Sequence, residues 1–242
     1  AARLRDWMFK TPPAPESMSA LNPEETARLR HYRQPADQWR LLLGRTILRL
    51  MLKEDHGIPA ADIVLTAKGK PVLAERYCNR LDFSITHDGL WVAVGITTRG
   101  LIGIDLSETS NFRDWDAFVR EYLDPAEIRQ LRDLPAPETP CAAARLWTAK
   151  EGILKAAGYG LTLDPRGIIL ERVPALMIRQ LPADLPALGF FHLEENGQLE
   201  ACSLTIVSLY ADPAIPAAAD IRQLQVEALP GVQNGRYPFR SS

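Results

Sequence analysis

The sequence contains 242 residues, 46% of them hydrophobic, and its 28 Lys and Arg nearly balance 30 Asp and Glu, leaving a formal net charge of −2. This length and hydrophobic content predict one large or two modest domains with a real core. The charge balance excludes a global basic field for nucleic acid or acidic lipid, so any anion site has to be local.

Membrane and disulfide-rich classes are also disfavoured. No apolar run approaches the roughly 18 residues that a membrane span needs, and the first ten residues lack the apolar core of a signal peptide. The three cysteines, Cys78, Cys141 and Cys202, are too few and too scattered for a disulfide framework or a zinc cluster. We therefore expect a cytoplasmic protein with free thiols.

Two helix signals open the N-terminal half. Asn22 is a suitable cap, with Pro23 at the first helical position of a helix over 22–32. Asp37 is expected to cap a stronger amphipathic helix over 38–57, because its apolar residues recur at three- and four-residue steps. Arg28 lies on the first helix and Arg45 on the second.

Strand signals follow at 63–65, 81–86, 90–97 and 101–106. The turn after the first carries Lys68, Gly69 and Lys70, which could place ammonium and N–H groups around a phosphate, although exposed turn lysines are the default reading. Short links between the last three strands predict an antiparallel meander. Asp105 interrupts the last strand, and Ser107 would share its face.

The C-terminal half repeats this order. Helical segments over 111–134 and a Pro-rich break lead to a helix within 145–161, where Glu151 and Lys155 project from one face. Alone, such a pair is usually a surface contact contributing roughly 0.2–0.5 kcal/mol. Strand patterns at 167–173, 188–194 and 198–209 follow, the last two joined by an Asn196-Gly197 turn signal.

The halves predict an α+β fold of two similar lobes, 1–106 and 107–242, each a long helix packed on a mainly antiparallel three-stranded sheet. A binding site between the lobes would be natural. Such a pseudo-duplicated chain is expected to be a monomer, and its second lobe includes the helical segment at 111–134 and the C-terminal tail.

The acidic residues suggest a metal site. Asp105 on a strand and Glu151 on a helix could bring two carboxylate oxygens onto one Mg²⁺, which keeps waters and takes substrate phosphates. Phosphate-ester chemistry needs the positioning and charge neutralisation that such a site provides. The countercharge would come from Arg28, Arg45, Lys68 and Lys70.

Five motifs in order along the chain resemble the 4'-phosphopantetheinyl transferases of the surfactin-synthetase-activating (Sfp) type. The resemblance implies a pseudo-twofold fold, with coenzyme A bound between two lobes. It also implies transfer of phosphopantetheine from coenzyme A to a serine of an acyl, peptidyl or aryl carrier protein, with release of 3',5'-ADP. We expect the carrier to dock near the helical segment at 111–134, whose arginines could meet acidic residues beside that serine. The motifs are NPEETARL at 22–29, AKGKPVLA at 67–74, FSITH at 83–87, GIDL at 103–106 and WTAKEGILKAAGYGL at 147–161.

The resemblance also implies residue roles. Asp105 and Glu151 look like Mg²⁺ ligands; Glu151 resembles the base toward the carrier serine, and Lys155 the residue that assists at the transferring phosphate. Where many members carry a second acid this chain has Ser107, so water or Glu108 could complete the metal shell. Arg45 could equally be a buried structural residue. The expected coenzyme A contacts are Arg28, Arg45, Lys68, Gly69, Lys70, Thr86, His87 and Lys150.

Two other functions fit parts of the pattern. A metal-dependent nuclease also uses Asp, Glu and Lys, but its Glu and Lys normally stand two apart on a strand, and this chain lacks a basic balance. A catalytically weak adaptor for coenzyme A or a carrier protein would retain the fold without turnover. Retention of Asp105, Lys150, Glu151 and Lys155 favours the enzyme.

Overall fold

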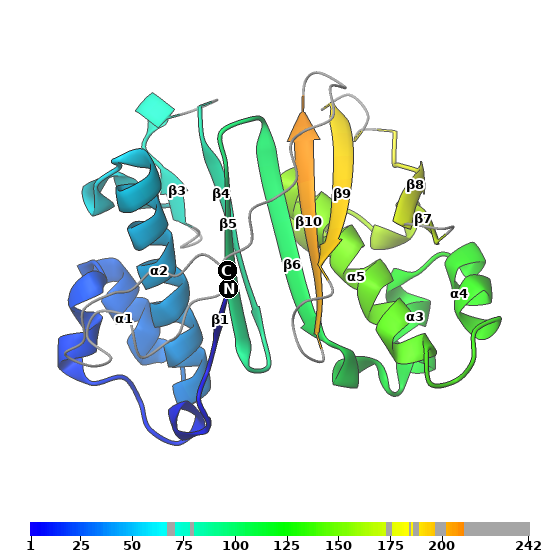
Figure 1. The fold of residues 1–242 in the computed structure, drawn as a ribbon, viewed down its shortest axis with the longest axis horizontal. Coiled ribbons are helices and arrows are strands. Elements are labelled where there is room, and N and C mark those ends of the chain that lie inside the picture. Colours follow the sequence, from blue (N-terminus) through cyan, green and yellow to red (C-terminus); the bar gives the residue numbers. More distant parts are fainter. Residues whose placement is uncertain are drawn as a thin grey trace. The chain divides into compact units, whose positions relative to one another are not determined.

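The computed structural model describes residues 1–66, 71–77, 80–172, 176–183, 185, 189–196 and 202–210. Their contacts form two compact units (Figure 1). The first unit contains the described residues of Ala1–Cys78 and of Ile85–Val94, and the second contains those of Asn79–Ser84 and from Gly95 onward. The strands that contain residues 82–97 therefore contribute to both units.

A long helix and a three-stranded sheet form the first unit. The sheet order is β1-β5-β4, and β2 and β3 pair separately as an antiparallel hairpin. The Asn22 side chain accepts a 2.8 Å hydrogen bond from the Glu25 N–H, which confirms the expected helix start. The elements are β1 (Ala2–Arg3), α1 (Pro23–His31), α2 (Pro35–His56), β2 (Ile63–Leu65), β3 (Pro71–Leu73), β4 (Asp82–Asp88) and β5 (Trp91–Thr97).

The start of α2 differs from the expectation. The helix begins at Pro35, two residues before the expected cap Asp37, and Gln34 occupies the cap position. Proline suits the first helical position because its missing N–H would have no partner there. Asp37 instead lies in the first turn, where the helix dipole favours a carboxylate.

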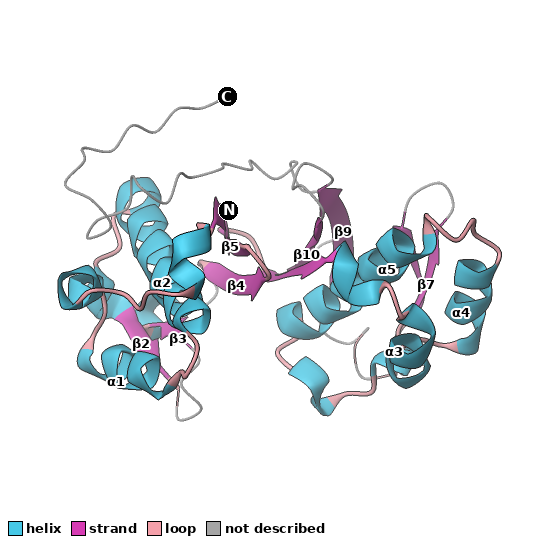
Figure 2. Cartoon of the chain, turned by 90° about the horizontal axis from the view of Figure 1, so that it is seen from below, coloured by secondary structure: helices cyan, strands magenta, loops and turns pink. Residues whose placement is uncertain are grey.

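The second unit is also built from a long helix, a three-stranded sheet and a two-stranded hairpin. Its sheet order is β6-β10-β9 with antiparallel pairing, and Figure 2 shows α5 beside β9 and β10. The two expected helical pieces over 111–134 are confirmed as α3 and α4. The elements are β6 (Leu101–Glu108), α3 (Trp115–Tyr122), α4 (Pro125–Arg132), α5 (Thr139–Ala156), β7 (Ile169–Arg172), β8 (Leu176–Gln180), β9 (Phe190–Asn196) and β10 (Cys202–Tyr210).

The expected meander is wrong at its third strand. β6 pairs with β10, with Asp105 opposite Thr205. Two side chains of β4 accept hydrogen bonds from β6: Asp82 from the Ile102 N–H at 2.9 Å and Ser84 from the Ile104 N–H at 3.1 Å. The compact units accordingly place β6 with the C-terminal half, whereas a boundary after residue 106 would place it with the N-terminal half.

Both units follow one order of elements. Each begins with a strand, continues through a long helix and a two-stranded hairpin, and ends with two strands, the last of which pairs with the first. β1, α2, β2, β3, β4 and β5 thus correspond in order to β6, α5, β7, β8, β9 and β10. The expectation of two similar α+β halves is confirmed, although the sheets do not use three consecutive strands.

A helical glycine lies over the sheet in each unit. A Cβ on Gly152 of α5 would stand 2.6 Å from a methyl of Val207 on β10. In the first unit, a Cβ on Gly44 of α2 would stand 3.7 Å from a methyl of Val92 on β5 and 3.1 Å from one of Ile85. Each long helix therefore packs closely on the strand that lies in the middle of its sheet.

Candidate active site

Gly103 sets the closest approach between strand and helix in the second unit. A Cβ at this position would stand 2.0 Å from the carbonyl oxygen of Gly152, so no side chain fits there. Side chains alternate along a strand, so Asp105 leaves β6 on the same side as Gly103, toward α5. The strand thereby brings a carboxylate, 6% exposed, against the helix that carries Glu151 and Lys155.

Lys155 and Asp105 form the tightest contact of this site. The Lys155 ammonium donates to Asp105 Oδ1 at 2.5 Å and to the Ile104 carbonyl oxygen at 3.2 Å. The side chains are 29% and 9% exposed, respectively, so the pair is partly shielded from water. The structure thus brings together Asp105 and Lys155, two of the residues expected to carry the chemistry.

Glu151 has an unsatisfied oxygen beside this pair. Its Oε1 is buried and has no hydrogen-bond partner among the described residues. Burial raises the pKa of the Glu151 carboxyl; the Lys155 ammonium opposes that shift, and the Asp105 carboxylate adds to it. A buried carboxylate oxygen without a partner is costly, and a bound cation would satisfy it.

Asp105 and Glu151 fit a magnesium ion. Mg²⁺ is usually bound by one or two protein carboxylates while waters and substrate phosphates complete its shell. Within the described part of the chain, no cluster of three or more His, Cys, Asp or Glu side chains could hold a metal on its own. Ser107 is buried, and Glu108 accepts a long 3.4 Å hydrogen bond from the Ser110 hydroxyl. The third ligand stays open between them and water.

A cluster of buried hydroxyls lies next to these residues and was missed from the sequence. The Thr148 hydroxyl, one turn before Gly152 on α5, lies 2.8 Å from the Thr205 hydroxyl and 3.0 Å from that of Ser203. Thr205 is also the register partner of Asp105. A polar residue within the apolar stripe of the helix was the available signal, but its partners on β10 stand more than 50 residues away.

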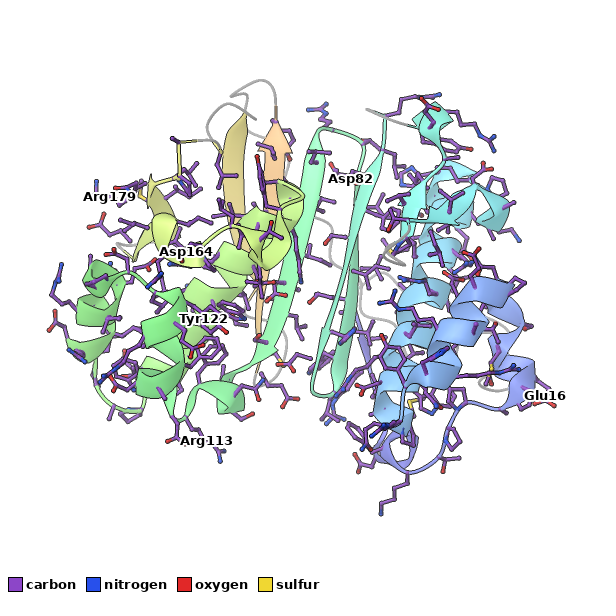
Figure 3. The ribbon with its side chains drawn as sticks, turned by 180° about the vertical axis from the view of Figure 1, so that it is seen from behind. Glu16, Asp82, Arg113, Tyr122, Asp164 and Arg179 are labelled. Carbon is purple, nitrogen blue, oxygen red and sulfur yellow. The ribbon has the colours of Figure 1, made fainter. Side chains whose placement is uncertain are left out.

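Lys150 does not fit its expected contact with coenzyme A. It is fully buried, and its ammonium donates to Glu127 Oε2 at 2.6 Å and to the carbonyl oxygens of Pro165 and Tyr122 at 3.0 and 3.1 Å. Tyr122, labelled in Figure 3, is the last residue of α3. The three donors of an ammonium are thereby used inside the second unit, and the side chain ties α5 to its neighbours.

Glu127 is the buried partner that completes this contact. Its carboxylate also accepts from the N–H groups of Asp124 at 2.8 Å and Leu170 at 2.9 Å, which links α4 to β7. Burial raises the pKa of Glu127 and lowers that of Lys150, while their mutual attraction opposes both shifts. The sequence signal was limited to a helix start at Asp124-Pro125, which indicates a capping box but no second partner.

Arg45 is buried in the first unit by a network around Glu25. Its Nε lies 2.9 Å from Glu25 Oε1, an ion pair by distance whose angles are not those of a hydrogen bond. Arg49 contacts Glu25 Oε2 at 2.5 Å. Burial lowers the pKa of Arg45, Glu25 opposes this, and Arg49 and Arg28 lower it further. Of the two readings of Arg45, these contacts favour the structural one.

The other expected coenzyme A contacts are placed only in part. Arg28 is exposed on α1. Thr86 is buried and the adjacent His87 exposed on β4, as expected for neighbours on opposite faces of a strand. Lys68, Gly69 and Lys70 lie outside the described residues, as do the glycine of the expected 196–197 turn and the tail beyond Tyr210. No described helix is both long enough and apolar enough to cross a membrane.

Comparison with known proteins places these residues in a family. The model of the 4'-phosphopantetheinyl transferase N-terminal region matches residues 5–98, and that of the 4'-phosphopantetheinyl transferase superfamily matches 101–202. The chain is 30% identical over 169 residues to the 4'-phosphopantetheinyl transferase HetI of Nostoc sp., covering 68% of this chain and 71% of that protein. The chain belongs to the 4'-phosphopantetheinyl transferase superfamily.

Other relatives of this chain are matched less completely. A protein of Synechocystis sp. is 31% identical over 160 residues, which span 64% of this chain but 65% of that protein, just under two thirds. A crystal structure of a holo-(acyl-carrier-protein) synthase from Bacillus anthracis, in complex with coenzyme A (3',5'-ADP), superposes with a TM-score of 0.40 at 20% identity, covering 46% of this chain and 96% of that one.

Proposed function

We propose that this phosphopantetheinyl transferase is of the Sfp type and moves 4'-phosphopantetheine from coenzyme A to a serine of a carrier protein, releasing 3',5'-ADP. Family membership and the two family models matched in tandem support the proposal. The observation that carries it is a buried oxygen of Glu151 that lies beside the Asp105–Lys155 pair and has no hydrogen-bond partner among the described residues. This arrangement offers a base and a cation about one turn apart on α5, and a place for a divalent metal ion beside Asp105 of β6.

The residues have distinct roles in the proposed transfer. Asp105 and Glu151 would hold Mg²⁺, which supplies charge neutralisation for the coenzyme A phosphates when bound. Glu151 accepts the serine proton, directly or through water, and its raised pKa makes the carboxylate a stronger base. The serine oxygen forms a bond to the phosphorus next to the pantetheine arm, and the bond from that phosphorus to the ADP oxygen breaks.

Basic and hydroxyl side chains complete the proposed substrate site. Lys155 neutralises charge at the transferring phosphate. Arg28, Thr86 and His87 are proposed contacts of coenzyme A from the first unit, together with Lys68, Gly69 and Lys70. Lys150 and Arg45 are left out, because the contacts of each are made inside its own unit. A monomer in the cytoplasm remains our expectation for the active form.

Intact mass measurement of apo carrier proteins tests the proposal. Acyl and peptidyl carriers are incubated together with the protein, coenzyme A and Mg²⁺, with Glu151→Gln and chelator-treated samples as controls. A mass gain of one phosphopantetheine group, lost in both controls, is expected, and the extent of gain ranks the carriers. Coenzyme A binding without any mass gain would contradict the transferase and favour the adaptor.

A further inference from the structure

The Lys155 ammonium contacts Asp105, a carboxylate to which a metal ion would have to bind. It donates to Asp105 Oδ1 at 2.5 Å and also to the Ile104 carbonyl oxygen at 3.2 Å, so both contacts are with β6. With 29% of its side chain exposed, Lys155 is not locked in the core. A flexible four-carbon stem allows such an ammonium to move to another acceptor without any backbone change.

The charges around this contact leave room for a stronger cation. When both carboxylates are ionised, Asp105 and Glu151 carry two negative charges against the single positive charge of Lys155. The Oε1 atom of Glu151 is buried and has no hydrogen-bond partner in the part of the chain that the structure describes, so these contacts satisfy Asp105 but not all of Glu151. A divalent cation bound to the two carboxylates would satisfy both. It would also repel an ammonium that lies within hydrogen-bond distance of Asp105.

We propose that Lys155 is the resident counter-ion of Asp105, and that a divalent cation displaces its ammonium when it binds to Asp105 and Glu151. The inference rests on the proposed function, because the displaced ammonium then becomes available to a substrate phosphate. Lys155 and the metal thus compete for Asp105, and in the metal-free protein the lysine stays paired with Asp105. Loss of the lysine should therefore impair phosphate chemistry while favouring metal binding.

Mn²⁺ binding without coenzyme A tests this competition. Free Mn²⁺ is measured by electron paramagnetic resonance in titrations of the wild type and of Lys155→Met, which keeps an unbranched side chain but removes the charge. Lys155→Met is expected to bind Mn²⁺ more tightly by about tenfold or more, because it removes both a competitor and a repelling charge. In the carrier mass assay the same variant should lose most of its transfer.

Matched variants separate charge from packing. Lys53→Met makes the same substitution on the exposed face of α2 and should leave Mn²⁺ affinity unchanged. Lys155→Arg keeps a competing cation and should bind no more tightly than the wild type. Lys155→Gln is the second neutral variant, in case Lys155→Met does not fold by circular dichroism. Asp105→Asn should weaken Mn²⁺ binding in both the wild-type and Lys155→Met backgrounds.

The outcomes distinguish this inference from the proposed function. Equal or weaker Mn²⁺ binding in both neutral variants, or no binding in any variant, would overturn the competition. If the wild type transfers phosphopantetheine but the neutral variants bind Mn²⁺ no more tightly, only this inference fails. If the neutral variants bind Mn²⁺ more tightly but no carrier is modified, the competition stands and the proposed function fails.

Discussion

Two glycines decide how close β6 and α5 can come. Gly103 and Gly152 meet where a Cβ on the former would stand 2.0 Å from a backbone carbonyl oxygen. Because backbone moves less easily than a side chain, this contact is stricter than that of a Cβ on Gly152 with the Val207 methyl at 2.6 Å. The position of Asp105, two residues beyond Gly103, depends on it.

Gly103→Ala should therefore separate β6 from α5. We expect it to lower the free energy of unfolding by about 1–3 kcal/mol, the usual cost of overpacking, and to reduce carrier modification further than the stability loss explains. Gly152→Ala is the matched variant and should cost less, because the Val207 side chain can rotate. Urea unfolding of both variants measures the difference, and a larger cost for Gly152→Ala would contradict the geometry.

The pKa of Glu151 gives the stability of the metal-free protein a dependence on pH. Burial raises that pKa in the folded state, so folding favours the protonated carboxyl. The stabilising contribution is complete below the unfolded pKa, about 4.3 for Glu, and is lost as pH rises through the higher folded pKa. Glu151→Gln is neutral throughout and lacks this loss.

The expected sign can be tested by measuring the free energy of unfolding of the wild type and of Glu151→Gln over a pH series in the presence of a chelator. The free energy of unfolding of the wild type, relative to that of the variant, should fall as pH rises from the ordinary range of a glutamate. Curves that stay parallel, or a wild type that gains stability with pH relative to the variant, would show that Glu151 is not held in a desolvating environment.

Sequence alone predicted part of this site for identifiable reasons. Strand alternation and four-residue helical spacing indicated Asp105, Glu151 and Lys155 as candidates, and the structure places Asp105 against Lys155 with Glu151 close by. The roles of Glu151 as base and of Lys155 at the phosphate came from the family resemblance. Lys150 could not be assigned from such spacing. It precedes Glu151 by one residue, which rotates its side chain by about 100° around the helix, and its partner Glu127 lies on α4.

Among elements, the buried Lys150–Glu127 pair joins α5 to α4. Lys150→Met leaves Glu127 buried without its ammonium, which typically costs about 3–5 kcal/mol. Replacing both residues, as Lys150→Met with Glu127→Leu, should recover part of that loss because no unpaired charge remains. Thermal or urea unfolding of single and double variants forms the test, and a double variant that is no better than Lys150→Met would argue against the ion pair as the source.

The exposed Arg166–Asp164 pair provides a comparison within the same unit. Its atoms approach to 2.7 Å, but both side chains are more than half exposed. Water and salt screen such a pair, so Arg166→Met should change stability far less than Lys150→Met. Equal losses in the two variants would mean that burial does not set the strength of these contacts.

Helices were more predictable than strand pairing. The start of α1 and the division of 111–134 into α3 and α4 depend on caps, prolines and apolar spacing within a few residues. The partner of β6 could not be found in that way, because β10 follows it by about a hundred residues. β1 is two residues long and carries no periodic signal, yet it forms the edge of the first sheet beside β5.

At the scale of the whole molecule, the repeated order of elements allows residues of the two units to be compared. Gly152 lies over Val207, whose register partner is Gly103, and Gly44 lies over Val92, whose register partner is Ala2. Counting from these positions, Leu4, Leu43 and Ile47 correspond to Asp105, Glu151 and Lys155. All three are at most 1% exposed, so apolar packing fills the equivalent place.

Because the first unit has apolar residues at the positions equivalent to the acids, we expect each chain to bind one divalent cation. Isothermal titration of the protein with Mn²⁺ in the absence of coenzyme A is expected to give a stoichiometry near one, and Asp105→Asn should weaken that binding. A second site of similar affinity that survives Asp105→Asn would show that the first unit, or another part of the chain, also binds the metal.

The shared order of elements, with a glycine at the same place in each long helix, has a consequence for history. Two copies of an ancestral half, joined in one gene, would each begin with the same groups at the helix–strand contact. After such a fusion, only one copy would need to keep its acids and lysine, and the other would be free to accumulate leucine and isoleucine. The chain would then record a division of labour between duplicated halves, one retaining chemistry and the other gaining stability.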